Sequence, residues 1–161
     1  MVMKTILLNG LLAALLLGMP LFFLSKTKTA PKPTQPMKFN AGIITPKVRE
    51  SKDFYTRYLG FGVTFENEWF VLLHSPGGNS SISFLLPEQA AQQPLFRPAF
   101  GGQGVFLTVE VPDVDAEYRR IRSLGVPIAV ELRDEPWGDR HFSLVDPNGI
   151  GVDIVTYTPP E

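Results

Sequence analysis

The sequence contains no cysteine, and this one absence excludes several kinds of chemistry. Without thiols the chain cannot form disulfides, zinc–thiolate sites or a cysteine nucleophile. Histidine is scarce too, because only His74 and His141 occur, and this leaves few imidazoles for a metal centre. The sequence also has no glycine-rich phosphate-binding loop and no nucleophile-elbow motif. The common metal, phosphate and covalent chemistries therefore lack their usual residues.

The chain also has almost no excess charge of either sign. Its 15 Lys and Arg residues stand against 16 Asp and Glu residues, which gives a formal net charge of -1. Basic residues are scattered among acidic ones instead of forming a stripe, so we predict no nucleic-acid partner. With 161 residues, 44% of them hydrophobic, the chain is long enough for one well-packed domain.

The first 24 residues differ in composition from the rest. An apolar run extends from Thr5 to Leu24, and about 20 apolar residues are needed to cross a bilayer. A signal-peptide core is shorter, at about 7–15 residues, and no small-x-small cleavage site follows this run. We therefore expect residues 1–24 to form a hydrophobic helix that anchors the chain in a membrane through residues 5–24. A cleaved signal segment is the alternative.

Residues 25–36 have the composition of a tether. They contain three prolines and several lysines but no large apolar residue, which is typical of a semi-extended linker. Lys4 precedes the apolar run and three lysines follow it, so the positive-inside bias favours the cytoplasmic side for the following domain but leaves both sides of the membrane open. If translation starts at Met37 instead, the domain is cytoplasmic and has no anchor. A single domain is expected over residues 37–161.

This domain is predicted to consist of two halves with the same order of elements. Apolar alternation predicts strands at 39–45, 61–66, 69–75 and 81–86, and again at 105–111, 128–133, 141–145 and 151–156. An amphipathic helix follows the first strand of each half. The first helix is expected to end at Gly60, and one of its faces carries Val48, Ser51, Tyr55, Tyr58 and Leu59. The second helix is expected to begin after the N-cap Asp113 and to end at Gly125. Its apolar face carries Val114, Tyr118, Ile121 and Leu124.

Each half therefore reads β-α-β-β-β, which indicates an α+β fold. One such half leaves a sheet face that it cannot bury alone, so the two halves are expected to pair. The joining segment, residues 87–102, contains Leu95, Phe96 and Phe100. We expect these three apolar side chains to pack onto the domain.

Three local patterns support a more specific interpretation. They are Ser-Lys-Asp-Phe-Tyr-Thr-Arg-Tyr-Leu-Gly-Phe at 51–61, Val-Pro-Asp-Val-Asp-Ala-Glu-Tyr at 111–118, and Arg-His-Phe-Ser-Leu-Val-Asp-Pro-Asn-Gly at 140–149. Together with the repeated element order, they resemble the vicinal oxygen chelate superfamily, which includes glyoxalase I, bleomycin-resistance proteins and extradiol dioxygenases. The resemblance implies paired βαβββ modules that form a half-open, barrel-like sheet cup, and it implies a homodimer.

The resemblance also indicates where metal ligands of the family would fall. By register these positions are Asn40, Phe106 and Asp153, with an optional fourth ligand at Leu72. Phe and Leu offer no donor atom, and Asn is a weak neutral ligand, whereas a divalent ion needs three or four oxygen or nitrogen donors. We therefore expect a cup without a metal and without a cofactor.

Several residues are candidates for contact with a ligand in the cup. They are Asn40, Leu72, His74, Phe106, Trp137, Arg140, His141 and Asp153. Trp137 either stacks on a ligand ring or holds its own loop in place. Arg140 either pairs with a ligand anion or forms surface ion pairs, and His141 has the pKa range needed to move a proton near neutral pH.

The remaining candidates carry alternatives of the same kind. Alternation places Asp153 on the cup side together with Gly151 and Val155. Its alternative role is a hydrogen-bonded carboxylate at the sheet edge. Asn40 either orients a ligand or satisfies the neighbouring backbone. His74 either lies at the mouth of the cup or is structural.

The favoured hypothesis is a protein that binds a small organic molecule, aromatic or conjugated, in a metal-free cup. One alternative is a metal-independent enzyme of the lyase or isomerase type that uses Asp153 or His141 as general acid or base. A second alternative is a membrane-tethered interaction module. The fold alone does not decide among them.

Overall fold

The alternation of apolar and polar residues becomes eight strands in the computed structural model, which describes residues 38–157. The predicted anchor at 1–24 and the tether at 25–36 lie outside the described residues. Among residues 38–157, no helix has the length and apolar character that crossing a membrane requires.

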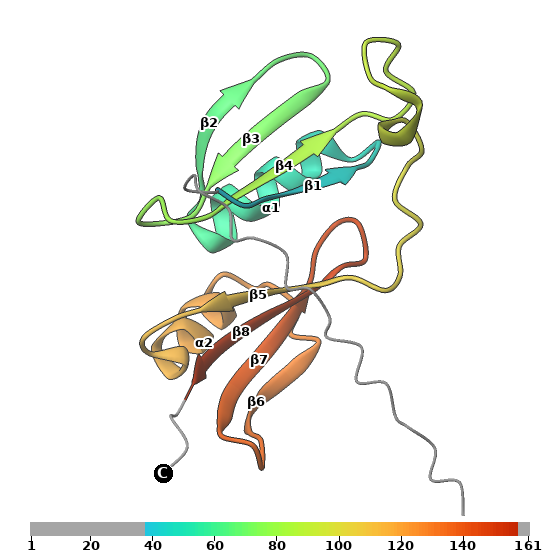
Figure 1. The fold of residues 1–161 in the computed structure, drawn as a ribbon. Coiled ribbons are helices and arrows are strands. Elements are labelled where there is room, and N and C mark those ends of the chain that lie inside the picture. The colour runs from blue at the N-terminus through green and yellow to red at the C-terminus, as the bar shows by residue number, and fades with distance from the viewer. Residues whose placement is uncertain (1–37, 158–161) are drawn as a thin grey trace, which may run out of the picture. The chain divides into compact units, whose positions relative to one another are not determined.

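The first half consists of four strands and one helix. They are β1 (Asn40–Ile44), α1 (Val48–Leu59), β2 (Gly62–Glu66), β3 (Phe70–His74) and β4 (Ser81–Leu85). The sheet has the order β1-β4-β3-β2, in which β1 runs parallel to β4 and the other neighbours are antiparallel. Figure 1 shows α1 behind this sheet.

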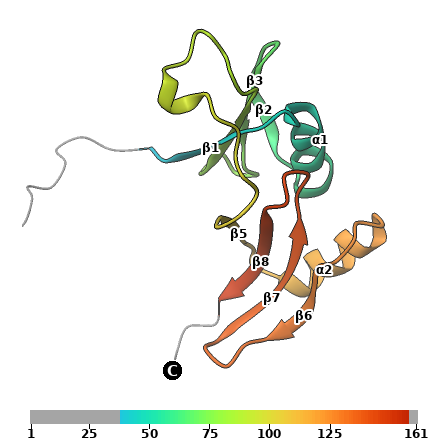
Figure 2. The same cartoon turned by 90° about the vertical axis from the view of Figure 1, so that its right-hand side faces the viewer.

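The second half repeats this arrangement. It comprises β5 (Phe106–Glu110), α2 (Val114–Ser123), β6 (Val130–Asp134), β7 (Asp139–Val145) and β8 (Gly151–Tyr157), with the sheet order β5-β8-β7-β6. Figure 2 shows α1 and α2 on the same side of their sheets. The α+β prediction and the repeated order β-α-β-β-β are confirmed.

The helix ends follow the predicted local chemistry. Gly60 ends α1 in the left-handed conformation with a φ of 70°, which glycine adopts without steric cost. At the start of α2, the Asp113 side chain accepts a hydrogen bond from the backbone N–H of Ala116 at 2.9 Å. Both boundaries therefore lie where the sequence predicts them.

The core lies between each sheet and its helix. Alternate strand residues such as Val71, Leu73, Val152 and Ile154 are fully buried there, while their neighbours point to the opposite side. Buried residues of both halves belong to one hydrophobic cluster. We call the sheet side away from the helix the open face of each half, because it carries the residues that the helices leave uncovered.

The prediction for the joining segment is partly wrong. Phe100 packs against the core, but Leu95 is 79% exposed and Phe96 is half exposed. The segment, which includes a short 3-10 helix at Pro94–Phe96, is held by its own polar contacts instead. The Arg97 guanidinium donates to the backbone oxygens of Gln92 and Ala90 at 2.9 and 3.2 Å. These bonds fix the loop without burial of its apolar side chains.

One turn of the second half docks onto the first half. We call this contact the joint; it consists of the turn 146–149 and the β1–α1 connection. The Asn148 amide oxygen accepts from the Thr45 hydroxyl at 2.6 Å, and its nitrogen donates to Ser51 Oγ at 2.9 Å. Tyr55 donates to the Asp146 carboxylate at 3.3 Å. Polar side chains therefore tie the two halves together inside a largely buried region.

The equivalent turn of the first half makes no such joint. In the first half, the first strand begins at Asn40 and the helix at Val48. In the second half, the corresponding strand begins at Phe106 and the helix at Val114. In this register Val111 and Glu117 replace Thr45 and Ser51, so the hydroxyl partners are missing. A cavity of about 780 Å³ lies beside this turn, lined by both of these residues. The joint thus ties the halves through several polar side chains on one side, whereas on the other side a cavity lies between them and the Arg120 guanidinium donates to the Tyr58 backbone oxygen.

Candidate functional site

The open face of the second half gathers polar side chains on three neighbouring strands. In the ladder of β8, Asp153 lies opposite Ser143 of β7 and Thr108 of β5. His141 lies two residues from Ser143 along β7, and it therefore points to the same face. The sequence places these side chains together by strand register alone.

The side chains form a continuous hydrogen-bonded chain. His141 Nδ1 lies 2.7 Å from Asp153 Oδ1, and His141 Nε2 lies 3.2 Å from Glu135 Oε1. Ser143 Oγ donates to the same Asp153 oxygen at 2.6 Å. Arg133 Nε lies 2.7 Å from Glu135 Oε1 and completes the chain at the β6 end. We call these residues the polar chain: Arg133, Glu135, His141, Ser143 and Asp153.

The polar chain favours the protonated imidazole of His141. Burial by itself lowers the pKa of His141, but hydrogen bonds to Asp153 and Glu135 and the charges of both carboxylates raise it by more. The net pKa therefore lies above the ordinary value of histidine. Both ring nitrogens are engaged, so neither is free to accept a proton from a ligand in this arrangement.

The same geometry does not form a nucleophilic triad. Such a triad needs a serine hydroxyl hydrogen-bonded to the free nitrogen of the histidine. Here the Ser143 hydroxyl donates to Asp153, and Glu135 occupies the other nitrogen of His141. Ser143 therefore positions the carboxylate and is not activated as a nucleophile.

The polar chain also does not converge on a point that would suit a cation. Asp153 and Glu135 lie at opposite nitrogens of the His141 ring, so their oxygens face different sides. Residues 38–157 contain no group of three or more His, Asp or Glu side chains arranged to hold a metal ion. The expectation of a metal-free and cofactor-free site stays a prediction.

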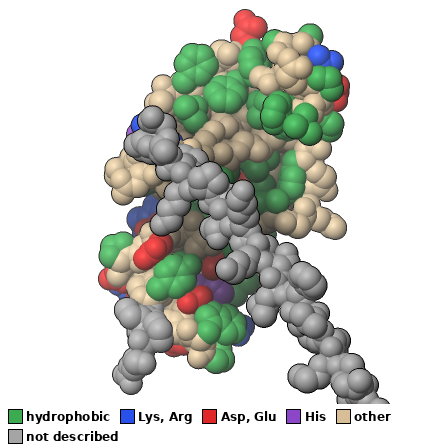
Figure 3. Space-filling model, in the orientation of Figure 1, with side chains coloured by type: hydrophobic (Ala, Val, Ile, Leu, Met, Phe, Trp, Pro, Cys, Tyr) green, Lys and Arg blue, Asp and Glu red, His purple; other side chains and the backbone are tan. Residues whose placement is uncertain are grey.

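The open face of the first half is mainly apolar or neutral. Asn40 donates to Ser83 Oγ at 3.2 Å, and Leu72 lies opposite Ser83 in the β3–β4 ladder. Rings gather at the far end of this sheet, where Phe65 and Phe70 have centroids 6.1 Å apart. Figure 3 shows hydrophobic side chains gathered over the first half, and acidic and histidine side chains on the second.

His74 lies at the other end of β3, on the same open face. Its ring covers Gly62, where an added Cβ would lie 2.4 Å from the ring atoms, and its Nδ1 lies 2.9 Å from the Thr64 hydroxyl. A glycine is therefore required below the ring. His74 and His141 lie in separate halves and do not share a cluster.

Two aromatic side chains stand near the polar chain without being buried. Phe106 is 73% exposed and lies opposite Gly151, which has no side chain to cover it. Trp137 is 68% exposed in the turn between β6 and β7, and its indole N–H donates to Asp139 Oδ2 at 2.8 Å. Both rings present apolar surface that the described chain leaves uncovered.

Arg140 points away from these residues. Its guanidinium makes two hydrogen bonds of 2.8 Å with the Asp115 carboxylate of α2 and one of 2.9 Å with Asp134. Arg140 and His141 are neighbours in β7, so alternation puts their side chains on opposite faces. Of the two roles considered for Arg140, the geometry favours surface ion pairing.

Three members of the polar chain, Arg133, Glu135 and Ser143, were not among the predicted candidates. Ser143 follows His141 at the spacing that puts both on one strand face, so alternation alone would have found it. Glu135 lies in the turn after β6, and no periodicity predicts the direction of a turn side chain. Its side chain is only 8% exposed because it lies between His141 and Arg133.

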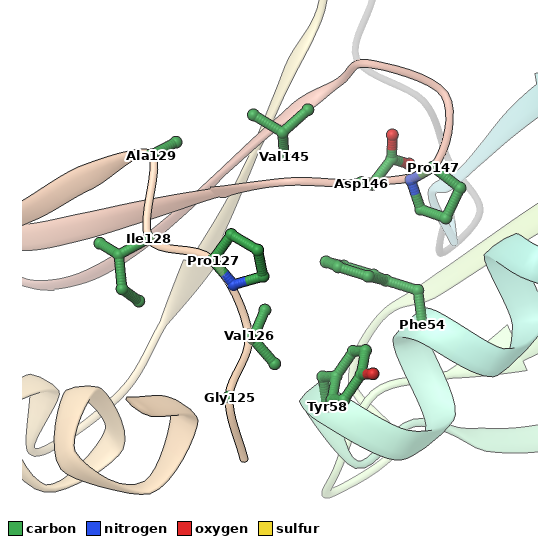
Figure 4. A pocket seen from close by; sticks show the side chains of 10 residues that line it. All are labelled: Phe54, Tyr58, Gly125, Val126, Pro127, Ile128, Ala129, Val145, Asp146 and Pro147. Atoms are coloured by element: carbon green, nitrogen blue, oxygen red, sulfur yellow. The ribbon is translucent and has the colours of Figure 1, made fainter. Parts of the chain in front are cut away.

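Two further cavities lie at the boundary between the halves. One of about 380 Å³ lies between β1 and β5 and is lined by Ala41, Tyr55 and Phe106. The other, of about 330 Å³, lies on the helix side beside the joint. Figure 4 shows Phe54 and Tyr58 of α1 facing Pro127 across it.

The polar chain predicts a pH-dependent contribution to stability. Because the folded-state pKa of His141 is raised above its unfolded value near 6.5, its stabilisation is complete below about pH 6.5. It is lost as the pH rises through the folded-state pKa. We expect His141→Gln to lower the free energy of unfolding by about 2 kcal/mol below pH 6.5, the size of one charge-assisted hydrogen bond. Urea unfolding of both proteins across the pH range should show this difference shrinking towards alkaline pH.

Ser143→Ala is the matched control, because it removes a hydrogen bond to Asp153 without removing a titrating group. Its effect on stability should stay constant over the same range. A His141→Gln penalty that is equally constant would contradict the raised pKa of this imidazole.

Comparison with known proteins agrees with the geometry of the fold. The family model of the Glyoxalase/Bleomycin resistance protein/Dioxygenase superfamily matches residues 39–154. A superfamily protein from Nocardioides is 20% identical, with a TM-score of 0.65 over 81% of this chain and 89% of that one. An antibiotic-binding protein from a Streptomyces species is 20% identical, with a TM-score of 0.62 over 79% of this chain and 100% of its own. A lactoylglutathione lyase from Agrobacterium tumefaciens is 19% identical, with a TM-score of 0.62 over 78% and 95%.

A shorter match exists to proteins of mycobacteria. An uncharacterized protein from Mycobacterium bovis is 31% identical over 64 residues, which are 40% of this chain and 42% of that protein. The match therefore spans only about two fifths of the length of this curated relative. The superfamily model, in contrast, covers both halves and the joint between them. The chain belongs to the glyoxalase/bleomycin resistance protein/dioxygenase superfamily.

Proposed function

We propose that the protein binds a small organic molecule with an aromatic or conjugated part, and that the open faces of the two halves form the cup that holds it. The observation that carries this proposal is the polar chain beside the exposed rings of Phe106 and Trp137. Binding sites for small molecules are mostly apolar, with a few fixed polar groups that orient the ligand. The two open faces together supply the apolar surface and the fixed polar groups.

The apolar part of the ligand would lie against Phe106 and the first half. Phe106 exposes most of its ring, and Leu72 is only partly covered in the neighbouring sheet. Burial of such surface stabilises a complex by about 25 cal/mol for each Å² removed from water. Trp137 lies at the opposite end of the second sheet from Phe106, so it would contact only a ligand that extends along the polar chain.

The polar part of the ligand would meet Asp153 and its neighbours. Two groups already hold the Asp153 carboxylate in place, so little side-chain entropy is lost when a ligand donates a hydrogen bond to it. Asn40 offers a further polar contact from β1. The solved structures with this fold include an antibiotic-binding protein, which is consistent with a binding role for this chain.

A metal-independent lyase or isomerase is the second candidate. A lactoylglutathione lyase is among the proteins of similar fold, and the two candidate acid or base residues, Asp153 and His141, both face the open side. Both ring nitrogens of His141 are engaged by carboxylates, and this geometry gives His141 the role of holding Asp153 in place and not that of the base. Unchanged turnover of an identified substrate by Asp153→Asn would remove this candidate.

Assembly into a homodimer, and an interaction role for the tethered domain, are further proposals. Each sheet ends in an outer edge strand, β2 in the first half and β6 in the second, whose backbone groups a second copy could meet. Sedimentation of the purified protein tests this directly. A strictly monomeric protein that still binds ligand would remove the dimer from the proposal.

Ligand binding can be measured with tryptophan fluorescence, because the chain has only two tryptophans. In a Trp69→Phe variant, Trp137 is the single reporter. We expect a panel of planar aromatic and conjugated compounds to include some that change its emission with saturation. Asp153→Asn should weaken such binding by about 1–3 kcal/mol, the cost of a lost hydrogen bond to a charged group.

Trp137→Phe, which leaves Trp69 as the reporter, is the matched control. Trp69 lies at the end of β3 beside Phe70, away from the polar chain. Isothermal titration of the unmodified protein against the same panel must agree with the fluorescence. No saturable binding by either method would rule out the proposed function.

Membrane attachment through residues 5–24 remains a separate proposal that rests on the sequence. We expect the full chain to sediment with membranes and to resist high-salt washing, because the apolar run is long enough to span a bilayer. A chain that starts at Met37 should stay in the supernatant. Release of the full chain by salt would argue for a peripheral contact instead, and equal behaviour of the two chains would remove the anchor.

A further inference from the structure

The joint contains a chemically reactive dipeptide, Asn148-Gly149. In an unstructured chain, the backbone nitrogen of a glycine attacks the side-chain carbonyl carbon of a preceding asparagine more readily than that of any bulkier residue. The reaction removes the side-chain amide. A second Asn-Gly pair, Asn9-Gly10, lies outside the described residues.

The reaction is balanced with water as the only co-reactant. A bond forms between Gly149 N and Asn148 Cγ, the Cγ–Nδ2 bond breaks, and ammonia leaves with the proton of the Gly149 amide. The resulting succinimide is opened by water at either carbonyl. The products are an aspartate or an isoaspartate at position 148.

In the folded protein every atom that must react is held. The Gly149 N–H donates to the backbone oxygen of Asp146 at 3.0 Å. The Asn148 amide oxygen accepts from Thr45, and its nitrogen donates to Ser51 at 2.9 Å and to Asp146 Oδ2 at 3.1 Å. The attack requires the side chain to rotate away from these partners, and the rotation requires the joint to open.

We propose that Asn148 is a deamidation site that the closed joint shields, and that its conversion prevents the joint from closing again. The hydrogen bonds that protect Asn148 from deamidation in the folded protein are the same ones that its conversion breaks. The proposal is independent of the ligand that the open faces bind.

The aspartate product cannot restore the joint. It places a carboxylate oxygen where the Asn148 nitrogen donated, next to the Asp146 carboxylate, which is 4% exposed. Two carboxylates at this distance repel each other in a poorly solvated site. The Ser51 hydroxyl offers no relief, because it already donates to the backbone oxygen of Lys47 at 2.7 Å.

The isoaspartate product fails for a different reason. It inserts one additional methylene into the main chain between residues 148 and 149. The turn closes through two backbone bonds to Asp146, one from Gly149 N and one between Asp146 N and Ile150 O. The longer main chain moves the donors and acceptors of both hydrogen bonds out of register.

The first test compares deamidation rates in the full chain. The protein is incubated at mildly alkaline pH, folded or in urea, and peptide mapping by mass spectrometry with isoaspartate detection separates Asn148 from Asn9. We expect deamidation of Asn148 in the folded protein to be slower by at least about tenfold, because it follows the population of the open state. Equal rates in the two conditions would overturn the shielding.

Variants of the joint sharpen this test. Thr45→Val removes the donor to the Asn148 oxygen and should accelerate deamidation. Thr56→Val is the matched control, because the Thr56 hydroxyl bonds only to the backbone of its own helix. If Thr45→Val does not fold, Lys47→Met removes the donor to the Pro147 oxygen at an exposed position. A folded joint variant that deamidates no faster than Thr56→Val would contradict the proposal.

The second test addresses the consequence of conversion. Asn148→Asp should unfold at lower urea concentration than the unmodified protein, because it reproduces the aspartate product. Asn79→Asp is the matched control in the corresponding turn of the first half, where Asn79 is exposed. Equal stability of the two variants would show that conversion does not open the joint.

Discussion

Two side chains of one turn, Asp146 and Asn148, form the main buried polar contact between the two halves of this protein. The pKa of Tyr55 is raised mainly by burial, and further by the charge of Asp146 and the hydrogen bond to it. The phenol therefore keeps its proton and donates a hydrogen bond to the Asp146 carboxylate. The Asp146 carboxylate also accepts from the backbone N–H groups of Asn148 and Ile150. A buried carboxylate is stable only when it is satisfied in this way. The position of one open face relative to the other depends on this contact.

The halves share one topology but differ in chemistry. At corresponding positions in the two ladders, the first half has Ser83 where the second has Asp153, and Leu72 where the second has Ser143. The duplication therefore supplies the frame, and the substitutions give one apolar and one polar open face. This asymmetry supports the proposed ligand, which has an apolar part and a hydrogen-bonding part. It also explains why the polar chain lies within the second half alone.

Much of the fold could be predicted from the sequence because its signals are local. Alternation, the Asp113 cap and the Gly60 terminus each act within a few residues, and the structure contains all of them. The sequence also named Asp153 and His141 as candidate residues of the same cup. It did not predict Glu135, whose direction depends on the turn after β6, or the exposure of Leu95. The sequence did not predict the joint, because the partners of Asn148, Thr45 after β1 and Ser51 in α1, are about a hundred residues distant.

The dependence of both halves on the joint can be measured by native-state hydrogen exchange of Asp146→Ala. In the unmodified protein we expect the buried strands of the two halves to open with the same free energy, as one cooperative unit. Asp146→Ala should lower that free energy by about 3 kcal/mol, the range for loss of a buried charged hydrogen-bond network, and should separate the two halves. Ser75→Ala, which affects the corresponding turn of the first half, should leave them coupled. Halves that remain coupled in Asp146→Ala, with a loss no greater than in Ser75→Ala, would contradict the central role of the joint.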